Sequence, residues 1–259
     1  MMTAAAMLTE EDGQARWVGT VPVGLPTEGD PLDALRGSID VLHTRPLPGL
    51  PPLTSGMVGM IGYDAVRRWE AIPDQNPDEL ALPDLAMLLV TDLAVFDHSD
   101  NTVWLIANAV NFDATSARVE AAHAEAVRRL DAMTSRLGSG ATAPAAAVDQ
   151  SAAAEPFRRT DQHEYERGVE RSVDYIRAGD AFQIVLSQRF TAPCSADALD
   201  VYRILRGSNP SPYLYLFRMP DPADPDSVWF DIVGSSPEAL VKVRSEERRV
   251  GKVGGGGGG

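Results

Sequence analysis

Polar side chains that could line a chemical site gather in the stretch Ala181–Phe190. Its polar and apolar residues alternate with a period of two, which predicts a β-strand. Gln183, Ser187 and Arg189 would then share one face, and all three can form hydrogen bonds, as in the wall of a polar pocket. The alternative is an ordinary strand glutamine whose amide is satisfied by its neighbours.

Residue types that commonly bind metals or attack substrates are sparse elsewhere. The chain has one cysteine, Cys194, so neither a disulfide nor an all-cysteine metal site can form within it. A lone cysteine usually behaves as a small hydrophobic residue, and a nucleophilic role would require a histidine nearby in space. The four histidines show no metal-ligand spacing and are expected in loops or on helix surfaces: His43, His98, His123 and His163.

An apolar run rich in glycine extends from Gly56 to Asp64. Such glycines can cradle a phosphate, but this run lacks the lysine and the serine or threonine of a P-loop. Close packing is the interpretation that we favour. We expect a strand here, followed by a short helix that carries Val66 and Trp69.

Charge and hydropathy exclude several classes of protein. The formal net charge of −14 argues against a nucleic-acid groove, which needs clustered lysine and arginine. No apolar stretch approaches the roughly 20 residues that span a bilayer. Residues 1–8 carry no basic residue and lack the apolar core of a signal peptide. We therefore expect a cytoplasmic enzyme or binding protein.

Apolar spacing predicts a mixture of strands and helices along the chain. In the first half it predicts strands at 15–18, 85–96 and 102–107, and helices that begin after Asp30 and at Val119. Residues 138–156 are mostly Ala, Gly, Ser and Pro, which indicates a linker. Beyond it, we expect a helix from Asp161 to Gly179, a helix over 196–206 and a hairpin of 213–219 with 228–233. This order lacks a βαβ rhythm and indicates an α+β fold of mixed or antiparallel sheets packed with helices.

Four stretches in series resemble the component I family of anthranilate synthases. They are Pro52–Asp64, Gly179–Phe190, Asn209–Tyr215 and Ile232–Leu240. Their order and spacing also fit the family, and the resemblance covers nearly everything from Gly13 to Val243. It implies an incomplete chorismate-binding enzyme fold, with a regulatory-type segment (1–137) and the first part of the chorismate-binding domain (157–243) on either side of the linker (138–156). The last stretch, 244–259, ends in six glycines, and we interpret it from its composition as a foreign or artefactual tail.

The resemblance implies a lyase of tryptophan biosynthesis that converts chorismate and ammonia to anthranilate and pyruvate with Mg²⁺. It also implies a glutamine amidotransferase partner, component II, which supplies ammonia, and feedback inhibition by L-tryptophan. The inhibitor-binding residues would be Asn209, Ser211, Pro212, Tyr213 and Leu214, with leucine at a position where the family has methionine. Gln183 would border the nucleophile site, where relatives that add water carry a lysine. An amide cannot activate water, and ammonia needs no base, so Gln183 favours amination.

Departures from the family lead us to expect a fragment truncated at both ends. The segment that forms half of the tryptophan pocket is missing at the start. The magnesium-binding glutamates and the acid/base histidine would follow Val243, so no metal ligand and no activity are expected within this chain. Two alternatives remain open: aminodeoxychorismate synthase component I, and a non-catalytic module that binds an amino acid.

Overall fold

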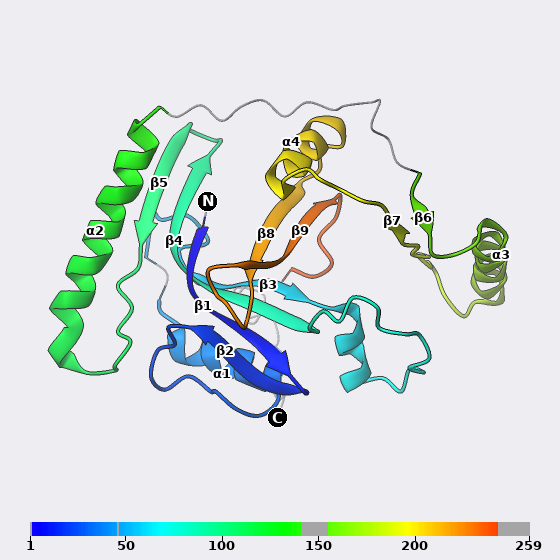
Figure 1. The fold of residues 1–259 in the computed structure, drawn as a ribbon, viewed down its shortest axis with the longest axis horizontal. Helices are drawn as coiled ribbons and strands as arrows, with labels where there is room; N and C mark the ends of the chain where they lie inside the picture. The colour runs from blue at the N-terminus through cyan, green and yellow to red at the C-terminus, as the bar shows by residue number, and fades with distance from the viewer. Residues whose placement is uncertain (1, 46, 141–154, 243–259) are drawn as a thin grey trace, which may run out of the picture. The chain divides into compact units, whose positions relative to one another are not determined.

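The computed structural model describes residues 2–45, 47–140 and 155–242 (Figure 1). Its elements group into two compact units. Unit 1 comprises Met1–Ala143 together with Phe217–Ile232, and unit 2 comprises Pro144–Leu216 together with Val233–Gly259. The assignment of Phe217–Ile232 to unit 1 was not indicated by the sequence. Most of the predicted linker, at 141–154, and the whole of the predicted foreign tail, 244–259, lie outside the described residues.

Unit 1 is built on a five-stranded antiparallel sheet. Its strands run in the order β2-β1-β4-β3, and β5 also pairs with β4. The bounds are β1 (Met2–Glu11), β2 (Gln14–Gly19), β3 (Gly56–Ile61), β4 (Leu85–Asp97) and β5 (Thr102–Ala107). The predicted strands at 15–18, 85–96 and 102–107 are thus confirmed, whereas β1 was missed.

Strand β4 is long enough to pair with three neighbours. β1 lies along one edge of β4, while β3 pairs with Leu85–Val90 and β5 with Asp92–Asp97 along the other. Asn108, directly after β5, lies at the break between these two partners. Its side-chain amide donates to the carbonyl of Thr54 at 2.7 Å and to that of Thr91 at 2.8 Å. The amide therefore satisfies backbone groups where the edge changes partner.

The two faces of this sheet are covered by different elements. Leu8 and Leu85 contribute to a buried cluster with residues of helix α1 (Pro31–Leu42). Met7 and Ala86, one residue away on each strand, belong to a second cluster that includes Met219. Successive side chains of a strand point to opposite faces, so the helix covers one face and the outer part of a hairpin, Phe217–Ile232, covers the other.

Local signals for α1 and for the glycine run are confirmed. Asp30 is the N-cap of α1, and its carboxylate accepts hydrogen bonds from the backbone N–H groups of Leu32 and Asp33 at 2.9 and 3.1 Å. A Cβ on Gly59 would lie 2.0 Å from the carbonyl oxygen of Ala86 on β4. Gly59 therefore permits close approach of two strands, as the packing interpretation requires. The short helix η1 (Tyr63–Arg68) follows β3.

Helix α2 completes unit 1 and packs along β5 (Figure 1). It spans Val119–Gly138 and is preceded by a turn of 3₁₀ helix, η2 (Ser116–Arg118). The helix predicted to start at Val119 is confirmed. Gly138 lies within its last turn, and Ser139 is the C-cap.

Unit 2 contains two helices, a short strand pair and the base of the hairpin. Its elements are β6 (Phe157–Arg158), α3 (Gln162–Ala178), β7 (Phe190–Thr191), α4 (Ala198–Ser208), β8 (Tyr213–Pro220) and β9 (Val228–Ser236), the last two shared with unit 1. Asp161 caps α3 at its start, and Gly179 ends it with a φ of 86°, so both predicted signals are confirmed. The predicted α+β class is confirmed as well.

The predicted strand Ala181–Phe190 is wrong for most of its length. Residues 181–189 have no regular secondary structure, and only Phe190 pairs, within β7. A strand requires a neighbour for its backbone groups, and among the described residues β6 offers a partner only to Phe190 and Thr191. Phe182, which would lie on the apolar face of the predicted strand, is fully exposed.

Candidate functional site

The predicted inhibitor segment, Asn209–Leu214, connects α4 to β8. Asp197 caps the start of α4 by accepting from the backbone N–H of Leu199 at 2.8 Å. At the other end, the backbone N–H of Asn209 donates to the carbonyl of Leu205 at 2.8 Å. The end of a capped helix therefore sets the position of Asn209, from which the segment turns into β8.

Every side chain of this segment is either exposed or half-buried. Ser211 and Leu214 are half-buried, whereas Pro212 and Tyr213 are exposed, with 45% of Tyr213 accessible. The five predicted residues thus lie on the turn from α4 into β8, with Tyr213 and Leu214 as the first two residues of the strand. The segment presents a proline ring and an aromatic ring to solvent, and such rings can pack against an apolar ligand.

Residues of β9 hold this turn from the other side. The hydroxyl of Ser235 donates to the carbonyl of Asn209 at 2.9 Å. Gly234 lies under Tyr215, because a Cβ on Gly234 would come within 2.1 Å of the ring carbon Cζ. The segments Asn209–Tyr215 and Ile232–Leu240, quoted separately from the sequence, therefore meet. Gly234 and Ser235 were not among the predicted site residues, although their place within a quoted motif was a usable signal.

Gln183 does not lie in a formed pocket wall. It is exposed within the irregular segment 181–189. Its neighbour Leu186 is half-buried, and a Cβ on Gly168 of α3 would lie 3.3 Å from Leu186 Cδ1. Leu186 thus lies against α3, while Phe182 and Gln183 face solvent.

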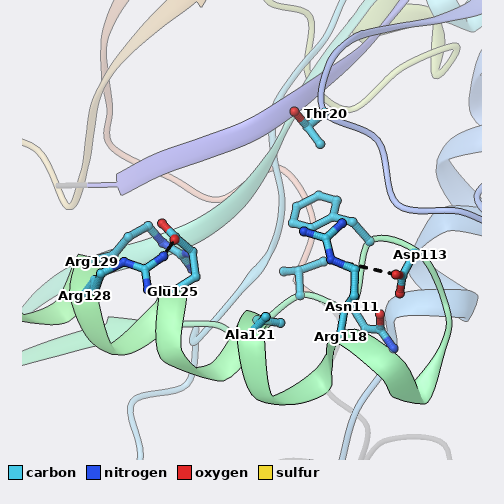
Figure 2. Close-up of a pocket in the computed structure, with 11 residues that line it drawn as sticks. Thr20, Asn111, Asp113, Arg118, Ala121, Glu125, Arg128 and Arg129 are labelled. Atoms are coloured by element: carbon cyan, nitrogen blue, oxygen red, sulfur yellow. Dashed lines mark hydrogen bonds and ion pairs between the residues drawn. The ribbon is translucent and has the colours of Figure 1, made fainter.

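A cavity of about 280 Å³ lies in unit 1 beside the first turns of α2 (Figure 2). It is lined by Thr20, Val110, Asn111, Phe112, Asp113, Arg118, Ala121, Ala122, Glu125, Arg128 and Arg129. Arg118 Nε lies 4.0 Å from a carboxylate oxygen of Asp113, and Arg128 pairs with Glu125. Because these arginines already face carboxylates, the charges around the cavity largely balance one another.

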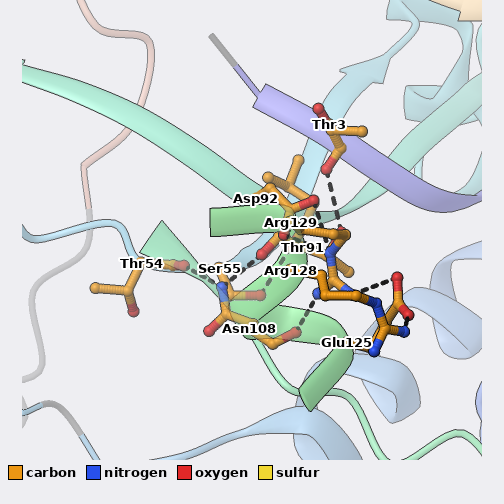
Figure 3. Close-up of polar contacts among 10 residues, drawn as sticks. Thr3, Thr54, Ser55, Thr91, Asp92, Asn108, Glu125, Arg128 and Arg129 are labelled. Carbon is orange, nitrogen blue, oxygen red and sulfur yellow. Dashed lines mark hydrogen bonds and ion pairs between the residues drawn. The ribbon is translucent and has the colours of Figure 1, made fainter. Parts of the chain in front are cut away.

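The third arginine of this cavity belongs to a partly buried polar network (Figure 3). Arg129 Nε donates to the two carboxylate oxygens of Asp92 at 3.0 and 3.1 Å, and Nη2 donates to the carbonyl of Asn108 at 2.8 Å. The Asp92 side chain is 7% exposed. This ion pair joins α2 to β4 and stabilises the fold. A single acidic residue inside the apolar run of β4 was the sequence signal for it.

Residues considered for metal binding or nucleophilic chemistry are dispersed. Cys194 is exposed, and so are His43, His98, His123 and His163. Within 2–45, 47–140 and 155–242, no three His, Cys, Asp or Glu side chains are grouped so as to hold a metal ion. No helix in the described part of the chain is both long and apolar enough to cross a bilayer.

Comparison with known proteins gives consistent matches over most of the chain. The model of the chorismate binding enzyme family matches residues 5–251. Anthranilate synthase component 1 of Mycolicibacterium smegmatis is 52% identical over 241 residues, which are 93% of this chain and 45% of that protein. The protein of the same name from Arthrobacter globiformis is 46% identical over 245 residues, covering 93% and 46%.

A solved structure matches as well. The crystal structure of anthranilate synthase component I from Streptococcus pneumoniae superposes with a TM-score of 0.68 at 29% identity, covering 94% of this chain and 50% of that chain. The chain therefore spans about half the length of the relatives that it matches.

Proposed function

The chain belongs to the family of chorismate-binding enzymes, and on that premise we propose that it serves as component I of an anthranilate synthase. The reaction would convert chorismate and ammonia to anthranilate and pyruvate in tryptophan biosynthesis. The observation that carries this proposal is the identity of 52% to a protein named anthranilate synthase component 1, over 93% of the chain. The turn Asn209–Leu214, which contains the proposed inhibitor-binding residues, is held against β9 by the hydrogen bond from Ser235 to Asn209.

Gln183 supports amination as the reaction type. Ammonia has a free lone pair and can attack without a general base, whereas water must first lose a proton. A neutral amide such as Gln183 cannot take that proton, but a lysine at this place could once deprotonated. Magnesium belongs to the proposal as the cofactor of the complete reaction.

Feedback inhibition by L-tryptophan is the regulatory part of the proposal. Pro212 and Tyr213 present apolar rings at the surface, where they could pack against an indole ring. Leu214 stands where the family has methionine, and the similar volumes of these side chains make the exchange tolerable. Asn209 and Ser211 would contribute polar contacts to the inhibitor.

The proposal also includes a partner and a compartment. A glutamine amidotransferase, component II, would supply ammonia, and the enzyme would act in the cytoplasm. The net charge of −14 fits a surface that does not bind nucleic acid or anionic lipid.

A chimera tests the proposed activity in cells. Residues 5–242 would replace the matching stretch of the Mycolicibacterium smegmatis component 1, and the gene would be placed in a tryptophan auxotroph that lacks component 1. We expect growth without tryptophan, as with the unmodified gene of the relative. An abundant, folded chimera that supports no growth on tryptophan-free medium, yet grows with added anthranilate, would contradict the proposal.

A further inference from the structure

Helix η1 and its C-cap residue present two aromatic side chains to solvent. In a 3₁₀ helix, residues three apart are eclipsed on the same face, so Tyr63 and Val66 share one face. Trp69 is the C-cap directly after η1, and its backbone N–H donates to the carbonyl of Val66 at 3.0 Å, which continues the stripe Tyr63–Val66–Trp69 by one turn. Tyr63 is 84% exposed and Trp69 69% exposed. Single exposed apolar residues are common on soluble proteins, but two large exposed aromatic rings at the two ends of one short helix make a candidate interaction surface.

The opposite face of η1 is firmly anchored. Ala65 is buried, and Arg68 forms ion pairs with Asp30 and, at 3.1 Å, with Glu10. Arg67 pairs with Asp64 at 2.8 Å and donates to the carbonyls of Ile72 and Pro73, both at 2.9 Å. The stripe thus stands on a fixed platform, and binding through it would cost little conformational entropy.

Charge around the stripe restricts the partner. Residues 61–84 contain two arginines and six carboxylates, which leaves a net charge of −4. The carboxylates are those of Asp64, Glu70, Asp74, Asp78, Glu79 and Asp84. Both arginines are already paired with carboxylates. A complementary surface therefore has an apolar pocket for the rings and a rim of lysine or arginine.

The same charge argues against two other occupants. A second copy of this chain would bring an identical acidic rim, and like charges facing each other oppose association. The cytoplasmic face of a membrane is anionic and attracts basic rather than acidic segments. The remaining partner for the stripe is a different protein with a basic rim. The relatives are named component 1, which points to another component as that protein.

We propose that the stripe Tyr63–Val66–Trp69 is the docking site for the second component, the glutamine amidotransferase subunit. This inference rests on the proposed function. The aromatic rings occupy an apolar pocket of the partner, and the carboxylates around η1 pair with its basic rim. Aromatic residues at such positions commonly contribute a large share of binding energy.

Calorimetric titration of the 259-residue chain with the purified second component of the Mycolicibacterium smegmatis enzyme tests the proposal. Trp69→Ala and Tyr63→Ala should each weaken binding at least about 30-fold, the usual threshold of an interface hot spot. Phe182→Ala is the matched control, because this aromatic ring is fully exposed and lies outside the stripe. It should bind like the unmodified chain. Affinity should also fall as salt is raised, because the rims are charged.

Unchanged affinity in the Trp69→Ala and Tyr63→Ala variants would overturn the docking site. So would self-association of the chain that Trp69→Ala abolishes, since the stripe would then join two copies. A chain that binds no second component would also overturn it. The proposed activity would stand or fall separately, because ammonium replaces the second component in the product assay described below.

Discussion

Tyr215 and Gly234 form the tightest contact of the candidate site. The ring of Tyr215 occupies the space that a side chain at position 234 would need, 2.1 Å from the ideal Cβ position. Gly234→Ala should therefore displace the ring or the strand and lower the free energy of unfolding by about 1–3 kcal/mol, as overpacking usually does. Urea denaturation of the chain measures this loss.

Gly207 provides the matched control for this substitution. It lies within α4, and a Cβ there would meet no atom within 4 Å. Gly207→Ala should be neutral or stabilising by up to about 1 kcal/mol, because alanine favours a helix. In the chimera, Gly234→Ala should also weaken inhibition by tryptophan, because the turn Asn209–Leu214 is in contact with β9. Equal stability of both variants would contradict the packing role of Gly234.

Asp84 gives a pH-dependent prediction. Burial, and then the nearby Asp64 carboxylate, raise the pKa of Asp84 above its ordinary value of 3.8. Between the ordinary and the raised pKa, the folded state holds a proton that the unfolded state has lost, so the free energy of unfolding falls as pH rises. Asp84→Asn should be more stable than the unmodified chain at neutral pH, by about 0.5 kcal/mol at most for a partly solvated group. Denaturation midpoints at several pH values measure the difference, which should vanish below pH 3.8.

Asp97 should show the opposite trend. Hydrogen bonds from the hydroxyl and the backbone N–H of Ser99, at 2.7 and 2.8 Å, lower the pKa of Asp97. Asp97→Asn should therefore be less stable at neutral pH, and the deficit should shrink as pH falls through the lowered pKa. The same trend in both variants would contradict this account.

Residue-level predictions succeeded where the signal was local. Asp30, Asp161 and Gly179 cap helices as predicted, because capping depends on a few adjacent backbone groups. The pair Asp92–Arg129 joins residues 37 apart. An acidic residue within the apolar run of β4 indicated a partner, but the spacing did not indicate which residue. The contact of Ser235 with Asn209 was missed for the same reason.

At the scale of elements, the ion pair between α2 and β4 leads to a further prediction. Arg129→Met should leave the buried Asp92 carboxylate without its partner and lower the free energy of unfolding by about 3 kcal/mol. The double variant Asp92→Leu/Arg129→Met should recover most of that loss. Chemical denaturation of the three proteins measures both effects.

Arg128→Met is the control for the α2 substitution. Its side chain is 66% exposed, and its ion pair with Glu125 lies on the surface. Surface pairs contribute little, so the variant should differ from the unmodified chain by less than about 1 kcal/mol. An equal loss in Arg128→Met and Arg129→Met would show that charge in general, and not the buried pair, stabilises α2.

The segment 181–189 shows the limit of periodicity at this scale. The alternation of polar and apolar residues predicted a strand. A strand also needs a partner strand within hydrogen-bonding distance, and the alternation does not indicate which segment that partner is. Where the partner follows nearby, as for β4 and β5 across a short turn, the prediction held. β1 was missed because its mostly small and apolar residues, Met2–Glu11, do not alternate.

At the scale of the molecule, the four stretches that resemble anthranilate synthases predicted the family, whereas hydrophobic periodicity predicted only the fold class. The resemblance to anthranilate synthase component I is confirmed by the relatives and by the solved structure. The α+β class followed from the order of elements. The grouping of Phe217–Ile232 with unit 1 did not, because it depends on the side chains of a hairpin reaching a sheet formed about 130 or more residues earlier. The inhibitor role of Asn209–Leu214 and the role of Gln183 remain predictions.

The central claim is that this chain serves in the amination of chorismate. The most direct measurement is chromatographic analysis of the products that the purified chimera forms from chorismate with ammonium and Mg²⁺. Anthranilate should be the aromatic product, and pyruvate should appear in equal amount. Formation of isochorismate or aminodeoxychorismate in its place, by a chimera that folds like the unmodified relative, would contradict the claim.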